Sequence, residues 1–156
     1  MVTLDDISAA VKARCAASSE FAAALPGGLW LDRGPDAPAG DYAIMTLERA
    51  GQPEWDSGGV YLQDWTLRIV TYVVLGLRPD RETPLEAADA NPAQAAQLAL
   101  AAAINPNPTS WDALRAGSVN CCLPQGYDGK HEPELRESKD VFAAAGQWGL
   151  LIEGTR

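Results

Sequence analysis

The sequence has few of the residues that carry catalytic or metal-binding chemistry. Among its 156 residues there is one histidine, His131. A centre with several histidine ligands is therefore excluded, and a histidine-based triad would have to be built around His131. Because acidic residues surround this histidine in the segment GYDGKHEPE, we expect a solvated loop residue rather than a catalytic base or a metal ligand.

Cysteine is also scarce, with three residues that lack the spacing of a metal site, Cys15, Cys121 and Cys122. Adjacent cysteines in a strand point to opposite faces, so Cys121 and Cys122 are poorly placed to bond to each other. We expect reduced, buried thiols at all three positions.

Basic residues are outnumbered, since 12 lysines and arginines stand against 21 aspartates and glutamates, a net charge of −9. A general nucleic-acid binder needs clustered basic residues for phosphate contacts, so the charge argues against this class. An acidic surface suits plain solubility, and it also suits a conduit that DNA crosses without being held. The chain has no apolar run long enough to span a membrane, and charged residues throughout its first 25 positions argue against a signal peptide. We expect a soluble protein that is made in the cytoplasm.

The most distinctive feature present is an alternating stretch from Val60 to Leu75, which predicts an unusually long β-strand. Strands usually have about 5 or 6 residues, so this one should extend beyond the core of its domain. From Val60 to Arg68 we expect it to project, and from about Ile69 to Leu75 we expect burial on both faces. One face would carry Tyr61, Trp65, Leu67, Ile69, Val73 and Leu75; the other would carry Leu62, Asp64, Thr66 and Arg68, followed by Val70, Tyr72 and Val74.

Capping and turn signals place other elements in the first half of the chain. Thr3, with Asp6 as its capping-box partner, predicts a helix that runs to about Leu25. Strands are predicted at Gly28–Leu31 and Tyr42–Glu48. The link from Arg49 to Gly59 would join the second of these to the long strand as an extended hairpin.

The second half begins with a predicted crossing loop, Arg78 to Ala90, and a helix capped at Asn91 with Pro92 first and Ile104 last. Its residues Ala96, Leu100, Ala103 and Ile104 should lie against the sheet. A strand is predicted at Ser118–Leu123, a loop from Pro124 to Glu134, and a closing strand within Val141–Glu153. The identity of Val141 to Gly146 is left open between helix and strand.

Together these elements predict one α+β domain over residues 1–156. Its sheet would be mostly antiparallel, with a long β-hairpin, and the two main helices would pack on one face of the sheet.

Tryptophan supplies the best candidate for a contact residue. Trp65 and Trp148 belong to predicted strands and should be core, whereas Trp55 lies in the hairpin link between two acidic residues. An exposed tryptophan on a loop is a good anchor for a protein interface, although this ring could also fold back onto its own domain. Asp64 and Arg68 lie on the polar part of the long strand and complete the set of candidate interface residues.

The order of the predicted elements along the chain is itself informative. A helix beginning LDDISAAVKARC is followed by a hairpin ending in WTLRIVTYVVLG, an alanine-rich second helix and a terminal segment KDVFAAAGQWGLLIEG. In element order and pattern, most of the chain resembles the small tail terminator and tail-completion proteins of long-tailed bacteriophages. The resemblance implies a structural virion protein rather than an enzyme, with no cofactor or metal. It would form a homo-oligomeric ring, expected to be a hexamer, that caps the tail tube and joins it to the head or neck.

The resemblance also implies partners and a location. The partners are further copies of the chain, the tail tube protein and a head–tail connector or neck protein, with DNA passing through the centre without specific binding and no membrane contact. The protein would be assembled in the host cytoplasm and reside in the virion tail or neck. Trp55, Asp64 and Arg68 would then contact a neighbouring subunit or the tail tube.

Three alternatives remain open. A head-completion or neck adaptor protein would belong to the same class. A small-ligand-binding module or enzyme would instead hold its site in the cleft between sheet and helices, using Asp64, Arg68 and His131. An adaptor domain of a non-viral complex would share the exposed tryptophan without forming a ring.

Overall fold

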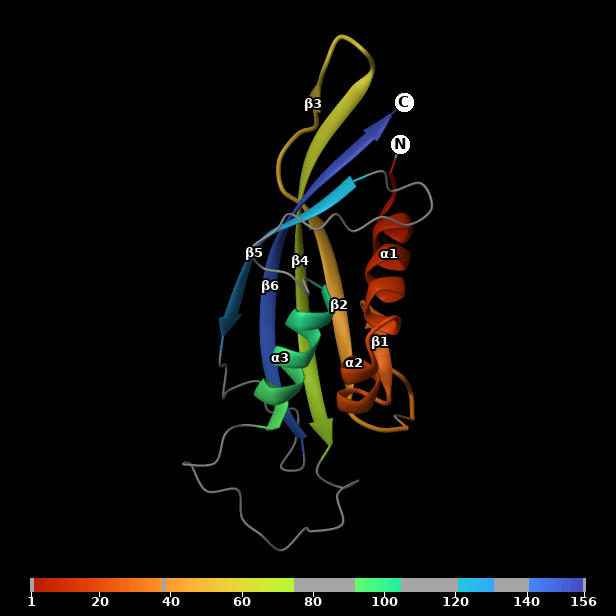
Figure 1. Ribbon diagram of the computed structural model, residues 1–156, viewed down its shortest axis with the longest axis vertical. Helices are drawn as coiled ribbons and strands as arrows, with labels where there is room; N and C mark the ends of the chain where they lie inside the picture. The colour runs from red at the N-terminus through yellow and green to blue at the C-terminus, as the bar shows by residue number, and fades with distance from the viewer. Residues whose placement is uncertain (1, 38, 75–91, 105–120, 131–140, 156) are drawn as a thin grey trace, which may run out of the picture.

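A long, twisted sheet with all of its described helices on one side forms the fold (Figure 1). The computed structural model describes residues 2–37, 39–74, 92–104, 121–130 and 141–155. Its elements in chain order are α1 (Leu4–Ala16), α2 (Ser19–Ala24), β1 (Gly28–Leu31), β2 (Tyr42–Arg49), β3 (Glu54–Trp55), β4 (Val60–Val74), α3 (Pro92–Ile104), β5 (Cys121–Lys130) and β6 (Val141–Thr155).

The sheet is built around β4, in the strand order β1-β2-β4-β6-β5, with β3 pairing with β4 outside this path. β4 and β6 are antiparallel and pair along their whole lengths, from Val60 opposite Thr155 to Val74 opposite Val141. β2 pairs with β4 from Arg49 opposite Trp65 to Tyr42 opposite Tyr72. Only β1 and β2 are parallel among the described strands. The predicted α+β class, with a long hairpin and a mostly antiparallel sheet, is confirmed.

Alternation along β4 separates a side that faces the helices from an outer side. On the helix-facing side the predicted apolar residues are buried in the main core: Tyr61, Trp65, Leu67, Ile69 and Val73. On the outer side Val70 is buried beside Ala143 and Ala145, and the Tyr72 ring stacks on that of Tyr42 at a centroid distance of 5.2 Å. The expected burial of both faces is therefore confirmed at Val70, while Leu75 lies outside the described residues.

The N-terminal helix begins as predicted but ends early. The Thr3 hydroxyl accepts a hydrogen bond from the Asp6 amide, and the Asp6 carboxylate accepts one from the Thr3 amide, which completes the capping box. The prediction of one helix to Leu25 is wrong, because the chain breaks after Ala16 and a second helix, α2, follows. The Ser18 hydroxyl accepts from the Phe21 amide at 3.2 Å, so it caps α2 rather than continuing α1.

The C-terminal third differs most from expectation. β5 runs from Cys121 to Lys130, so the loop predicted from Pro124 is wrong as far as Lys130. A shift in the pairing register between Pro124 and Gly126 accommodates the proline in this edge strand. Several predictions fall outside the described residues: the start of the predicted strand (118–120), the end of the predicted loop (131–134), the crossing loop (78–90) and the Asn91 cap.

The open question about residues 141–146 is resolved, since this segment is strand and pairs with β4. Its alanines favour a helix intrinsically, but pairing with a central strand overrides that preference. Ala143, Ala144 and Ala145 are all buried, two of them in the outer-side cluster and one in the main core.

Polar contacts fix α3 over the middle of the sheet. The predicted core residues Ala96, Leu100, Ala103 and Ile104 are buried, and beside them lies the buried side chain of Gln97. Its Nε2 donates to the carbonyl oxygens of Ile69 in β4 and Ala144 in β6, at 2.8 and 2.9 Å. The Thr71 hydroxyl lies 3.0 Å from the carbonyl oxygen of Ala93. These contacts tie the helix to both long strands.

Gln97→Ala should therefore lower the free energy of unfolding by about 2–4 kcal/mol, because it removes two buried hydrogen bonds and leaves a cavity between α3 and the sheet. Urea denaturation followed by circular dichroism measures this. Leu98→Ala is the control on the same helix, because the Leu98 side chain is 62% exposed, and it should change the value by less than about 0.5 kcal/mol. Equal effects of the two substitutions would contradict the assigned role of Gln97.

Candidate assembly interface

One end of the sheet extends beyond the helices, and we call it the arm: residues 54–64, which comprise β3, the turn and the start of β4, and residues 151–155 of β6. Figure 1 shows the tip of the arm rising past both ends of the chain. The predicted projecting segment from Val60 to Arg68 is too long, because Trp65 and Leu67 are buried in the core. On the helix-facing side burial continues into the arm, because Tyr61 and Ile152 also belong to the main core, so only the tip beyond Tyr61 projects freely on that side.

A break in the edge of the sheet marks the base of the arm. β2 ends with Arg49 opposite Trp65, and β3 resumes with Glu54 opposite Leu62, so the chain between them makes an excursion from the ladder. The buried Gln63 side chain closes this gap, since its Nε2 donates to the carbonyl oxygens of Gly51 and Asp64, both at 3.0 Å. Gly51 has a φ of 95°, which favours glycine at the excursion.

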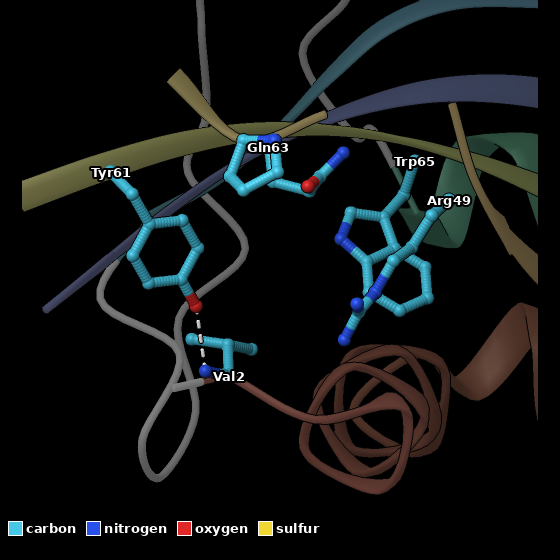
Figure 2. Close-up of a pocket in the computed structure, with 6 residues that line it drawn as sticks. Val2, Arg49, Tyr61, Gln63 and Trp65 are labelled. Atoms are coloured by element: carbon cyan, nitrogen blue, oxygen red, sulfur yellow. Dashed lines mark hydrogen bonds between the residues drawn. The ribbon is translucent and has the colours of Figure 1, made fainter. Parts of the chain in front are cut away.

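The helix-facing side of the arm is organised by Tyr61. Its hydroxyl accepts a hydrogen bond of 2.6 Å from the Val2 amide, just before α1 (Figure 2). The Trp55 ring lies against the Tyr61 ring at a centroid distance of 5.0 Å. Gly154, opposite Tyr61 on β6, leaves room for the ring, because a Cβ at that position would overlap it. Tyr61 therefore joins β3, β6 and the N-terminal segment.

Between Tyr61 and Trp65, a cavity of about 20 Å³ lies between the arm and the start of α1. It is lined by Val2, Arg49, Pro53, Tyr61, Gln63 and Trp65, most of which are seen in Figure 2. The Arg49 guanidinium lies over the Trp65 ring, 5.3 Å from its centroid, in a cation–π contact. A space of this size holds about one water molecule and is too small for a metabolite.

The tip of the arm is closed by Asp56. Its carboxylate accepts hydrogen bonds from the amides of Gly58 and Val60, at 2.8 and 2.9 Å. Its own amide donates to the Val60 carbonyl at 2.8 Å, and Gly59 takes a φ of 80°. The sequence signal for this turn is an aspartate followed by a serine and two glycines, a pattern typical of Asx turns.

The outer side of the arm carries a different set of side chains. Leu62 is 38% exposed and lies in one cross-strand row between Glu54 on β3 and Glu153 on β6. Two positions along β4, Asp64 is opposite Leu151. Both leucines are thus bordered by exposed acidic residues.

The three candidate interface residues do not form one site. Trp55, 40% exposed, lies on the helix-facing side with Tyr61, so the ring is neither free of its own subunit nor buried by it. Asp64 and Arg68 lie on the outer side, and Arg68 belongs to the body of the sheet, between Thr46 and Gln147. Sequence reasoning missed Tyr61 and Gly154; the available signal was a glycine within the last strand, which often marks a close approach.

Two of the three residues proposed for a small-ligand site do not face the space between the sheet and the helices. Asp64 and Arg68 point away from the space between sheet and helices, and the buried core fills that space beneath Trp65, Leu67 and Ile69. His131 lies outside the described residues. Within the described ranges, no three His, Cys, Asp or Glu residues are grouped as metal ligands would be. None of the helices in those ranges is both long and apolar enough to cross a membrane.

Cys15 is fully buried in the main core and is a free thiol, as expected. Burial raises the pKa of this thiol to about 12, against a weaker opposing effect of the neighbouring Arg14 cation. A thiol with this pKa is not a nucleophile near neutral pH. Cys121 and Cys122 are located in β5 at positions opposite Glu153 and Ile152.

Comparison with solved structures gives an informative similarity, whereas the sequence comparisons do not. No protein-family model matches the sequence, and no curated protein is similar to it in sequence. Among solved structures, a chain from the virion of a native gene transfer agent (GTA) particle has a TM-score of 0.53 with this chain. The two are 19% identical, and the similarity covers 94% of this chain and 93% of the other. This protein therefore shares the fold of that virion chain over nearly the whole length of both.

Gly154→Ala should displace the Tyr61 ring and break its bond to Val2, lowering the free energy of unfolding by about 1–3 kcal/mol. Thermal denaturation checks the loss. A matched control is Gly58→Ala, where a Cβ would meet only the Asp56 carboxylate, at 3.4 Å, and where little change is expected. If Gly154→Ala is as stable as the parent, Tyr61 does not depend on the glycine.

Asp56→Ala should speed hydrogen exchange at the amides of Gly58 and Val60, because both lose their carboxylate acceptor. Exchange measured by NMR should rise about tenfold or more at these two amides and remain unchanged in α3. Asp56→Asn, which keeps an acceptor oxygen, should restore most of the protection. Unchanged exchange in Asp56→Ala would show that the turn does not rely on this side chain.

Proposed function

We propose that this protein is a structural component of a phage-like virion: a homo-oligomeric ring, expected to be a hexamer, that caps the tail tube and joins it to the head or neck. The observation that supports this most strongly is the fold shared, across nearly the whole of both chains, with a chain of a gene transfer agent virion. The whole of residues 1–156 would act as one domain in this ring.

The arm is consistent with a role in assembly. β4 and β6 have 15 residues each, so at about 3.3 Å per residue each reaches roughly 50 Å, more than the helices cover. At this end of the sheet Leu62 and Trp55 expose apolar surface that a neighbour could cover. Trp55 gives that part a large, half-exposed aromatic anchor of the kind that dominates protein interfaces.

Charge is consistent with the passage of DNA. With a net charge of −9, the protein has no general attraction for phosphates and would release rather than retain DNA that crosses the ring. The partners would be further copies of this chain, the tail tube protein and a head–tail connector or neck protein, and the ring would reside in the virion at the tail or neck.

Trp55→Ala should impair ring formation while costing the monomer only about 1 kcal/mol, the usual value of one aromatic contact such as that with Tyr61. Light scattering after size exclusion, with and without added tail tubes, measures assembly, because some rings of this class would form only on the tube. We expect the concentration required for assembly to rise about tenfold or more.

Trp30→Ala is the matched control, since Trp30 is 41% exposed but lies on β1, on the outer side of the sheet. Its loss should leave assembly unchanged. A parent protein that stays monomeric at high concentration and does not bind tail tubes would overturn the proposed function. Immunogold labelling of assembled particles separates a tail terminator from a head-completion or neck adaptor protein.

A further inference from the structure

The outer side of the arm combines an apolar centre with an acidic border. Leu62 and Leu151 lie on adjacent strands, and Glu54, Asp64 and Glu153 border them. No described helix covers this side, because α1, α2 and α3 all lie on the other side of the sheet (Figure 1). Leu62, which is 38% exposed and is covered by none of the described helices, is surface that a partner can bury.

A second copy of this chain is a poor partner for this surface. Two acidic arms would repel one another, and like charges brought together at an interface cost several kcal/mol. The described lysines and arginines are spread over α1, β2, β4, β5 and the segment after β1, and none lies in the arm: Lys12, Arg14, Arg33, Arg49, Arg68 and Lys130. Arg33 is paired with Asp36, and Arg49 lies on the Trp65 ring. Across the whole sequence, acidic residues outnumber basic ones by 21 to 12, and no segment holds a run of lysines or arginines.

Nucleic acid is disfavoured by the same charges, since phosphates would meet three carboxylates, and the residues of the arm include no lysine or arginine. The complementary surface is a protein one that presents lysine or arginine side chains around an apolar centre. Such a surface would pair its cations with the carboxylates and cover the two leucines.

We propose that the outer side of the arm is the docking surface for a basic protein chain different from this one. The inference rests on the proposed function for the existence of an assembly, and it adds the chemistry of the partner and the side of the arm that binds it. Subunit contacts through Trp55 would use the opposite side, so one arm could contact a neighbouring copy and a foreign chain at the same time.

The test uses the full chain and a short synthetic peptide of alternating arginine and valine, labelled for fluorescence anisotropy. Matched peptides carry glutamate or serine in place of arginine. The parent protein should bind the arginine peptide and neither of the others, and binding should weaken as salt rises. Asp64→Asn combined with Glu153→Gln should weaken binding about tenfold or more, and Leu62→Ser should weaken it severalfold.

The control variant removes the same number of charges from the exposed helix residues Asp5 and Glu20, as Asp5→Asn with Glu20→Gln, and should change binding less than about twofold. Equal losses in the two variants, or no binding by the parent, would overturn the proposal. If Leu62→Ser abolishes self-association of the protein, the surface binds a second copy of this chain, and the proposal is overturned. Ring assembly is measured separately. If the ring still forms and still depends on Trp55 while the arginine peptide does not bind, the docking proposal fails and the proposed function stands.

Discussion

The pairing of β4 with β6 is the interaction on which the rest of the molecule depends. It runs unbroken from Val60 opposite Thr155 to Val74 opposite Val141, and it serves two purposes along its length. In the body of the sheet it provides the surface that α3 covers, where Gln97 bonds to a carbonyl of each strand. Beyond the helices the same ladder continues as the arm. A projecting part built from two central strands continues the hydrogen-bond ladder of the core, and the contacts of Tyr61 with Val2 and Trp55 add to that support.

The fold was largely predictable where a local signal and the tertiary structure agree. The alternation in β4, the Thr3 capping box and the proline at the start of α3 each predicted where an element begins. Where a local preference was overridden, the prediction either stayed open, as for residues 141–146, or was wrong, as for the loop from Pro124. The alanines at 143–145 favour a helix, and Pro124 signals a loop, yet both lie in strands because a long neighbouring strand was available for pairing.

The candidate interface was only partly predictable, for a geometric reason. The sequence identified Trp55, Asp64 and Arg68 as surface residues, and alternation separated Asp64 and Arg68 from the buried face. It could not show that Trp55 contacts Tyr61, because that depends on how the chain from Ala50 to Pro53 leaves the ladder. Contacts that join Val2 or Gly154 to Tyr61 connect distant parts of the chain, and no local pattern reports them.

The order of the strands in the chain has a consequence for folding. β4 is central in the sheet, but its partner β6 is synthesised long after it, so one edge of β4 stays unpaired while the intervening chain is made. Contacts between distant segments slow folding, and an unpaired strand rich in valine, isoleucine and aromatic residues is prone to aggregate. The polar residues at Asp64, Thr66 and Arg68 interrupt the apolar surface of β4 on one face. Besides any role in assembly, they would protect the nascent chain until β6 arrives.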